Sequence, residues 1–244
     1  MAKLRINGDS SGYVDLEAPN AASSSTLDLD QVPQKNVANT FTTGQNITVP
    51  GNGGLTIQAG TNGSASLRLK NDATDWDVNC QTIDTFAIYN HTTGGSRLSI
   101  TPAGIVTKPN QPSFNAQRTS NQGIQGGTTL IFNQARHNAG NHYNTSTGVF
   151  TAPVTGDYLF TFKSLFYAFA TTEYLDLYIT VNGTTRNRYE QTGNSGQHTQ
   201  IDYTEVVRLN ANDGLYLYAN NRNSSATHYS MYGNENHFSG YLLG

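Results

Sequence analysis

The sequence predicts an all-β protein, and three observations carry that prediction. Thr, Asn, Gly and Ser together fill 100 of the 244 positions, and Thr favours strands whereas Asn, Gly and Ser favour turns. Charged residues make up only 13% of the chain, against roughly 25% in an average globular domain. Short strings that alternate apolar and polar residues recur between Gly- and Asn-rich turns, as half-buried strands do.

Aromatic residues divide the chain unevenly. Of the 25 Phe, Trp and Tyr residues, 20 follow Gln111, and large aromatic side chains dominate core burial. We therefore expect the main globular domain, the head, over residues 111–244. Residues 1–49 contain only alternating strings that are too short to bury a core, so we interpret them as an extended docking and linker segment.

Residues 50–110 are predicted to form a small β stalk domain. Five alternating strings indicate short strands, at residues 55–57, 67–69, 76–78, 86–89 and 98–100. The unit has few aromatic residues, and we expect it to need neighbouring chains to complete its core. The Pro-rich string at 108–112 predicts the linker to the head.

In the head, strand patterns recur at the spacing of a β-sandwich. They cover residues 128–132, 149–151, 158–165, 174–181, 200–209, 215–219 and 238–243. Asn182-Gly183 between two apolar-rich runs predicts a two-residue hairpin. Gly156 lets the chain turn into the longest strand, where Tyr158, Phe160 and Phe162 share one face because side chains alternate.

Charge and cysteine content exclude several classes of protein. The net charge is −3, without the basic excess of a nucleic-acid-binding protein. No stretch approaches the roughly 20 apolar residues of a membrane-spanning helix, and no apolar leader follows Lys3 and Arg5. Cys80 is the only cysteine, which excludes a disulfide scaffold. We expect no nucleic acid partner, no membrane insertion and no cofactor, and synthesis in a reducing cytoplasm.

Eight residues of the head fall at the spacing F-x5-[ND]-x4-[FYWL]-x6-F-x5-G-x-Y-x-F-x-[FY]. They are Phe132, Asn138, Tyr143, Phe150, Gly156, Tyr158, Phe160 and Phe162. This pattern is the signature of the C1q domain, and the strings 112–116 and 238–243 resemble the opening and closing strands of that family. The resemblance implies a jelly-roll sandwich of the C1q and tumour-necrosis-factor superfamily, assembled as a homotrimer.

The resemblance also implies aromatic side chains packed in the core and around a threefold axis. The core and trimer candidates are Phe114, Phe132, Tyr143, Phe150, Tyr158, Phe160, Phe162, Tyr216, Tyr218, Phe238 and Tyr241. We expect Tyr216, Tyr218 and Phe238 at the axis. The alternative is that these three belong to the ordinary core of a single chain.

The layout ahead of the head is similar to fibre proteins of tailed bacteriophages, marine ones in particular. The GYVDLEAP string from residue 12, the Gly/Asn/Thr-rich stalk and the KPNQPSF string from residue 108 carry this likeness. It implies that the N-terminal segment docks on other virion proteins, through Tyr13, Val14, Leu16, Leu27 and Leu29. It also implies a place in the virion, as a tail or baseplate fibre or on the capsid surface, after assembly in the host cytoplasm.

No catalytic or metal-binding constellation stands out, so we expect no enzyme and no metal site. His137 and His142 lie in a Gly/Asn-rich string without further ligand residues. Asp72, Asp75 and Asp77 lack the spacing of an EF-hand loop, and a polar turn explains them better.

Amide and aromatic residues concentrate at 220–236, with a second cluster at 186–189. Amides hydrogen-bond sugars and Tyr or His rings stack on them, which is the adaptable contact chemistry of paratopes. The receptor-binding candidates are Arg186, Arg188, Tyr189, His228, Tyr229, Tyr232, Asn234 and Asn236. The alternative is that residues 228–232 form the penultimate strand, with Tyr229 and Met231 packed inside.

We therefore expect a homotrimeric phage fibre or adhesin whose C1q-like head recognises a host-surface glycan or protein. Three alternatives stay open. One is a trimeric capsid or tail decoration protein without receptor binding, and another is a polysaccharide-degrading spike that uses Glu173 or Asp202. The third is a bacterial surface or spore adhesin.

Overall fold

The computed structural model describes residues 3–7, 13–17, 57–61 and 63–244, with gaps at 168–171, 194–197, 223–227 and 231–234; for 3–7, 13–17 and 228–230 it describes the backbone alone. The chain divides into two compact units, Met1–Thr56 and Ile57–Gly244. In the first unit, β1 (Lys3–Asn7) pairs antiparallel with β2 (Tyr13–Glu17). The docking candidates Tyr13, Val14 and Leu16 lie on β2, whereas Leu27 and Leu29 lie outside the described residues.

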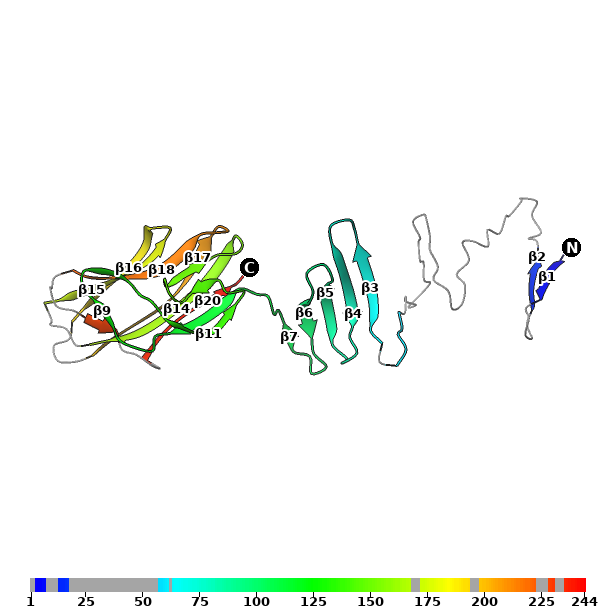
Figure 1. The fold of residues 1–244 in the computed structure, drawn as a ribbon, viewed down its shortest axis with the longest axis horizontal. Coiled ribbons are helices and arrows are strands. Elements are labelled where there is room, and N and C mark those ends of the chain that lie inside the picture. Colours follow the sequence, from blue (N-terminus) through cyan, green and yellow to red (C-terminus); the bar gives the residue numbers. More distant parts are fainter. Residues whose placement is uncertain are drawn as a thin grey trace. The chain divides into compact units, whose positions relative to one another are not determined.

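Within the second unit, a single antiparallel sheet precedes the head (Figure 1). This middle sheet runs in chain order through β3 (Ala65–Lys70), β4 (Asp75–Cys80), β5 (Phe86–Asn90), β6 (Ser96–Ile100) and β7 (Val106–Thr107). Four of the five alternating strings predicted for the stalk lie in β3 to β6. At the fifth, Ile57 is outside any strand, and residues 55 and 56 are not described.

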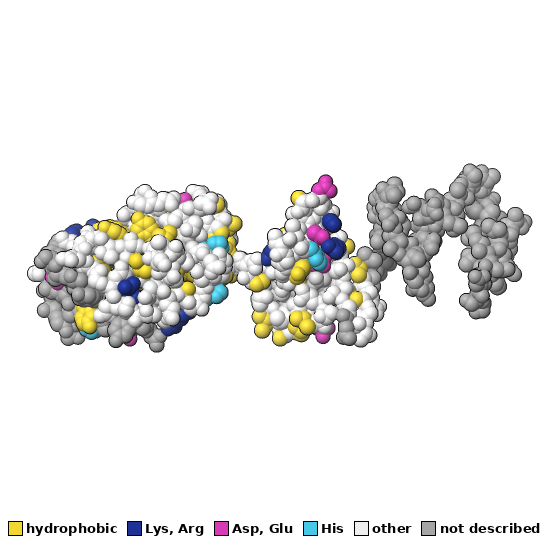
Figure 2. Space-filling view, viewed as in Figure 1, with side chains coloured by type: hydrophobic (Ala, Val, Ile, Leu, Met, Phe, Trp, Pro, Cys, Tyr) yellow, Lys and Arg dark blue, Asp and Glu magenta, His cyan; other side chains and the backbone are white. Residues whose placement is uncertain are grey.

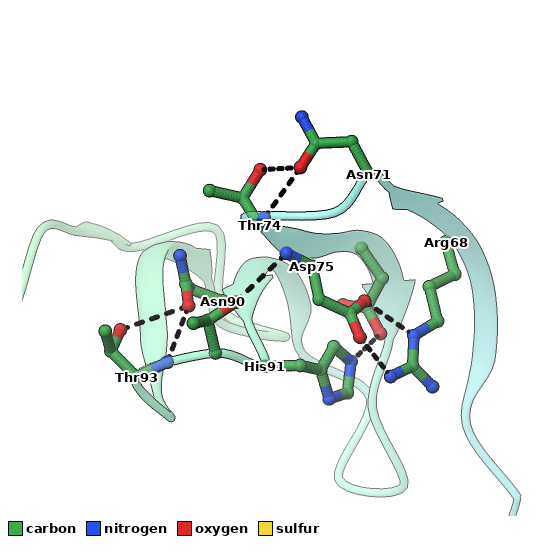
Figure 3. A network of polar contacts seen from close by, with 9 residues as sticks. Arg68, Asn71, Thr74, Asp75, Asn90, His91 and Thr93 are labelled. Carbon is green, nitrogen blue, oxygen red and sulfur yellow. Dashed lines mark hydrogen bonds and ion pairs between the residues drawn. The ribbon is translucent and has the colours of Figure 1, made fainter.

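Arg68, Asp75, Asp77 and Asn79 lie on one face of the middle sheet, and the network around Arg68, Asp75 and His91 is seen in Figure 3. Arg68 donates two hydrogen bonds to Asp75, at 2.7 and 2.5 Å, which lowers the pKa of the Asp75 carboxyl. Asp77 is 5% exposed; its carboxylate lies 2.8 Å from Nε2 of His91 and accepts a 2.7 Å hydrogen bond from Asn79. The charged groups of this network are paired within a single chain, as buried charges generally are.

The head is a sandwich of two antiparallel sheets, named here by their central strands. The β18 sheet contains β12 (Tyr143–Asn144), β13 (Val149–Thr151), β18 (Gly214–Asn221), β15 (Tyr174–Val181) and β16 (Thr184–Thr192) in that order, and β10 (Gly127–Thr129) also pairs with β18. In the β14 sheet, β14 (Gly156–Phe166) pairs on one side with β17 (Thr199–Leu209). On its other side, β14 pairs with both β20 (Asn236–Leu242) and β19 (His228–Ser230). Beyond β20 come β8 (Ser113–Gln117) and then β11 (Gln134–Ala139), and beyond β19 comes β9 (Gln122–Ile124).

All seven strings predicted as head strands overlap strands of the structure. The hairpin prediction is confirmed as well, because Asn182 and Gly183 join β15 to β16 with φ angles of 49° and 80°. A two-residue turn of this kind needs positive φ at both positions, which Asn and Gly tolerate best.

Aromatic rings fill the space between the two sheets. The ring of Phe114 lies edge-on to that of Phe238 at 5.0 Å between centroids, and Phe160 stacks on Phe238 at 5.9 Å. Around them lie the other signature aromatics, each almost fully buried: Phe132, Tyr143, Phe150, Tyr158 and Phe162.

Asn138, the one amide among the signature residues, links β11 to β12 beside this core. Its amide donates to the carbonyl of Tyr143 at 2.8 Å and accepts from the amide of Tyr143 at 3.1 Å. The hydroxyl of Tyr143 in turn accepts from the backbone N–H of Phe132. The eight spaced positions therefore mark one physical cluster.

Three of the core and trimer candidates point away from this cluster. Tyr216, Tyr218 and Tyr241 lie on the outward faces of the two sheets. Phe238 is 0% exposed within a single chain. The expectation that Phe238 lines a threefold axis is therefore corrected, because a side chain enclosed by its own chain cannot contact another copy.

Gly240 provides a test of how tightly the core is packed. A Cβ atom at this position would lie 2.4 Å from Cε1 of Phe114 and 2.8 Å from Cε1 of Phe160. We expect Gly240→Ala to lower the free energy of unfolding by about 1–3 kcal/mol, because the two rings must move out of their packed positions. Urea unfolding measures this, and Gly60→Ala is the control, since its Cβ would meet no heavy atom within 4 Å. Equal stability of the two variants would contradict the packing described here.

Candidate functional site

The outward face of the β18 sheet carries the densest group of aromatic and charged side chains that the structure describes. On β18, Leu215, Leu217 and Ala219 enter the core, so the residues between them point outward. Strand register aligns these residues in two rows, Arg188–Tyr178–Tyr218 and Glu190–Asp176–Asn220. We call this surface the tyrosine face, and it comprises Tyr174, Asp176, Tyr178, Arg188, Glu190, Tyr216, Tyr218, Asn220 and Arg222.

A buried carboxylate organises the tyrosine face. The Asp176 side chain is only 1% exposed, and its oxygens lie 3.0 Å from Nη2 of Arg188 and 3.5 Å from Nε of Arg222. The Tyr178 hydroxyl donates a further hydrogen bond to Asp176 at 3.0 Å. Glu190 accepts from both arginines. Burying a charge is costly unless it is paired and hydrogen-bonded, so this network holds its side chains in one arrangement.

The same network raises the pKa of two of its members, Tyr178 and Arg188. Burial raises the pKa of the Tyr178 phenol, and its hydrogen bond to Asp176 raises it further, so Tyr178 stays a neutral donor at physiological pH. Hydrogen bonding to Asp176 raises the pKa of Arg188. The formal charges of Arg188 and Arg222 balance those of Asp176 and Glu190, so the tyrosine face has no formal net charge.

The rings of the tyrosine face are held by close packing. Tyr178 and Tyr218 lie 6.0 Å apart between centroids, inclined by 52°. The Arg222 guanidinium lies 5.2 Å from the centroid of the Tyr174 ring, a cation–π contact. Gly127 leaves the space that the Tyr218 ring occupies, since a Cβ there would lie 1.5 Å from the Tyr218 hydroxyl oxygen.

Two receptor-binding candidates from the sequence are corrected by this geometry. Tyr189 points inward from β16, stacks on Tyr203 at 4.7 Å and donates to Glu205 at 3.1 Å. Asn236 is buried and hydrogen-bonded to Ser164. Asn236 is enclosed and cannot contact a receptor, and Tyr189 is half-buried with its ring packed against the core, because alternation along each strand turns these side chains inward.

The other candidates fall in different places. Arg188 belongs to the tyrosine face, and Arg186 is exposed on the same strand. His228 and Tyr229 lie on β19, so the alternative of a penultimate strand is confirmed for residues 228–230. Tyr232 and Asn234 lie outside the described residues.

Sequence reasoning missed most of the tyrosine face. Tyr174, Asp176 and Tyr178 were not predicted as binding residues, although each lies in a predicted strand, whereas Asn220 and Arg222 belong to the 220–236 cluster. The signal available was the alternation along β15, β16 and β18, which shows the outward positions of each strand. These strands are neighbours in the sheet, but β18 is separated from the other two in sequence by β17. Only their pairing brings Asp176 between the two arginines.

The acidic residues of β17 point to different faces of the sheet. On β17, Asp202 points outward, whereas Glu205 turns toward Tyr189 and Asn187 and accepts hydrogen bonds from both. His137 lies 2.8 Å from the Ser113 hydroxyl. No group of three or more His, Cys, Asp or Glu side chains in the described residues could hold a metal ion. Nor does any described helix have the length and apolarity needed to cross a membrane.

A second outward face, on the β14 sheet, carries one apolar row among polar and charged residues such as Asp157, Lys163 and Asp202. Register places Val206, Leu159 and Tyr241 in one row, and Thr204, Thr161 and Ser239 in the next. Val206 and Tyr241 are exposed although both are large apolar side chains. We call this surface, with Leu165, the β14 face.

The family of the head follows from a comparison with protein-family models. Residues 113–243 match the model of the C1q domain. The chain belongs to the C1q family. The expectation of an all-β chain with a C1q-like jelly roll is thereby confirmed, and the C1q domain begins at β8 and ends just after β20.

Several solved structures are similar to the C1q domain of this chain, and each match covers 55% of the chain. The globular domain of zebrafish complement 1qA protein is 18% identical, is covered over 98% of its length and has a TM-score of 0.44. Eiger TNF from S. frugiperda is 13% identical, with 93% covered and a TM-score of 0.45. Murine APRIL at pH 5.0 is 14% identical, with 99% covered and a TM-score of 0.44. No curated protein sequence matches the chain.

His237 gives the C1q domain a predictable response to acid. Burial lowers the pKa of its imidazole, and the charges of Lys163 and Arg136 lower it further. The unfolded chain therefore takes up a proton more readily, so this stability is present above the ordinary His pKa and is lost as the pH falls through the folded value. We expect acidification from pH 7 to pH 5 to lower the melting temperature less in His237→Gln than in the unmodified chain. Thermal unfolding at both pH values measures this, with His198→Gln as control; an unchanged pH response in His237→Gln would contradict it.

Proposed function

We propose that the chain is a homotrimeric, non-catalytic fibre or adhesin protein of a tailed-phage virion. Its C1q head binds a neutral glycan of the host surface through the tyrosine face, so in this proposal Tyr216 and Tyr218 contact the glycan and do not line the threefold axis expected from the sequence. The observation that carries the proposal is the buried Asp176, which holds Arg188, Arg222 and Tyr178 in one arrangement at the surface.

The chemistry of this face suits a sugar. Tyr rings supply large rigid contact surfaces at low entropic cost, and Tyr174, Tyr178, Tyr216 and Tyr218 are all half-buried there. Polar groups of fixed direction give specificity to a binding site. Because the charges of the two arginines are balanced by Asp176 and Glu190, the face favours a neutral sugar over an anionic one.

Self-association is supported by the β14 face. Its exposed Val206 and Tyr241 beside the half-buried Leu159 form an apolar patch that suits burial against another copy. A homotrimer is also what the C1q resemblance implies. Three identical heads convert weak binding of single sugars into strong attachment, because the second and third contacts form within one tethered particle.

The N-terminal segment is proposed to attach this trimer to other virion proteins. The β1–β2 hairpin and its residues Tyr13, Val14 and Leu16 lie at that end of the chain. The support is the likeness of the GYVDLEAP string to phage fibre proteins. A position on the tail, baseplate or capsid, reached after assembly in the host cytoplasm, is part of this proposal.

Tyr218 is the residue of choice for testing the glycan site. We expect Tyr218→Ala to weaken binding to a neutral oligosaccharide by at least about tenfold, as truncation of an interface Tyr anchor does. The measurement is binding of the full chain to an array of neutral and acidic oligosaccharides, with native mass by light scattering in parallel. The control is Tyr89→Ala, which removes a half-buried Tyr from the middle sheet and should leave binding unchanged.

Each contrary result has a distinct meaning. A native mass of one chain at micromolar concentration would overturn the homotrimer. A trimer that binds no glycan on the array would favour the decoration protein. Binding that survives Tyr218→Ala would move the site away from the tyrosine face, and immuno-gold labelling of particles with an antibody to residues 111–244 would separate tail from capsid.

Gly127→Ala tests the same site without removing any ring. The new Cβ would overlap the Tyr218 hydroxyl, so the ring must tilt away from its present position. We expect the variant to keep its native mass and to lose oligosaccharide affinity in the same direction as Tyr218→Ala. Unchanged affinity in Gly127→Ala would show that the position of the Tyr218 ring does not matter for binding.

A further inference from the structure

The middle sheet has an apolar face opposite its polar network. Strand register places Leu67 beside Val78, Val78 beside Ile88, and Ile88 beside Leu98, so these side chains share one face. The apolar face comprises Ala65, Leu67, Leu69, Trp76, Val78, Cys80, Phe86, Ile88, Leu98, Ile100 and Val106, with Asn90 at its border. No residue of this set carries a charge.

On the middle sheet, large apolar side chains are exposed and polar side chains are buried, which is the reverse of the usual arrangement. Leu67 and Leu69 on the apolar face are 50% and 58% exposed, whereas Asp77 and Asn79 on the polar face are buried. A continuous exposed apolar surface of this kind marks an interaction site in soluble proteins. Within the described residues the apolar face therefore lacks the cover that its composition demands.

The polar face is the one suited to water. Arg68 pairs with Asp75, and His91 with Asp77, without help from another chain (Figure 3). In Figure 2, basic, acidic and His side chains gather together on the part of the chain that holds this sheet. Because these groups already satisfy one another, covering the polar face would bury charges for little gain.

We infer that the apolar face packs against the same face of two further copies of this chain. Three such sheets, arranged around an axis, enclose an apolar interior and leave their polar faces in water. A single layer of five short strands cannot bury a core by itself, and closed cyclic symmetry covers identical faces with one operation.

Two features favour a copy of this chain over a different partner. The apolar face has no charged group that would require a complementary charge, so a second apolar face fits it. The head of the same chain also exposes the apolar side chains of Val206 and Tyr241 on the β14 face, and the copies that cover the middle sheet are available to cover them. The inference rests on the proposed function only for the number of copies, and it is independent of glycan binding.

Cys80 is a natural reporter for this packing, because it lies on the apolar face, is exposed in a single chain and is the only cysteine. In the full chain, we expect its thiol to react with an aromatic disulfide reagent at least about tenfold more slowly than in the unfolded chain, since reaction requires opening. The urea concentration that exposes Cys80 should also rise with protein concentration, as it does when other copies provide the cover.

Neighbouring residues of β3 provide a matched pair of variants. Leu67 and Ser66 are both exposed in a single chain but point to opposite faces. We expect Leu67→Asp to restore fast reaction of Cys80, because the trimer would have to bury a charge, and Ser66→Asp to leave Cys80 protected. Both variants should fold, since neither changes a side chain buried within one chain.

Three results would overturn the inference. A trimer in which Cys80 reacts as fast as in the unfolded chain would leave the apolar face uncovered, while the proposed function of the head would stand. Protection whose urea dependence ignores protein concentration would assign the cover to a segment of the same chain, such as residues 18–56. A protected Cys80 in both Asp variants would place the contact elsewhere on the sheet.

Discussion

The head depends on one constraint, which is that aromatic rings must fill the space between its two sheets. Phe114, Phe160 and Phe238 meet at the centre of that space, from three adjacent strands of the β14 sheet. Gly240 stands between two of these rings because any Cβ there would collide with them. Once the rings are buried, alternation along each strand determines what every outward position can do.

The two outward faces of the sandwich therefore differ in chemistry by residue choice alone. On the β18 sheet the outward positions hold tyrosines and paired charges around Asp176, which suits recognition of a polar ligand. On the β14 sheet they hold Leu159, Val206 and Tyr241, which suits contact with another copy. Outward positions of the two sheets can thus differ in chemistry without any change in the core.

The middle sheet applies the same alternation to a single layer. Its polar face is closed by Arg68, Asp75, Asp77 and His91 within one chain, and its apolar face is left open. A sandwich covers such a face with its own second sheet, but the described part of this unit has one sheet. The apolar face of the middle sheet is therefore left without cover by the described part of its own unit.

Alternation, turn residues and aromatic spacing in the sequence were enough to predict the all-β class, the strands of the head, the Asn182-Gly183 hairpin and the C1q signature, because each is a local pattern along one strand or turn. The core aromatics followed for the same reason. What only the tertiary structure decided is which strands lie side by side. That pairing placed Asp176 between Arg188 and Arg222, sent Tyr189 and Asn236 inward, and enclosed Phe238 within one chain. Strand pairing joins residues far apart in sequence, and a period of two says that a side chain alternates but not which of the two faces becomes the core.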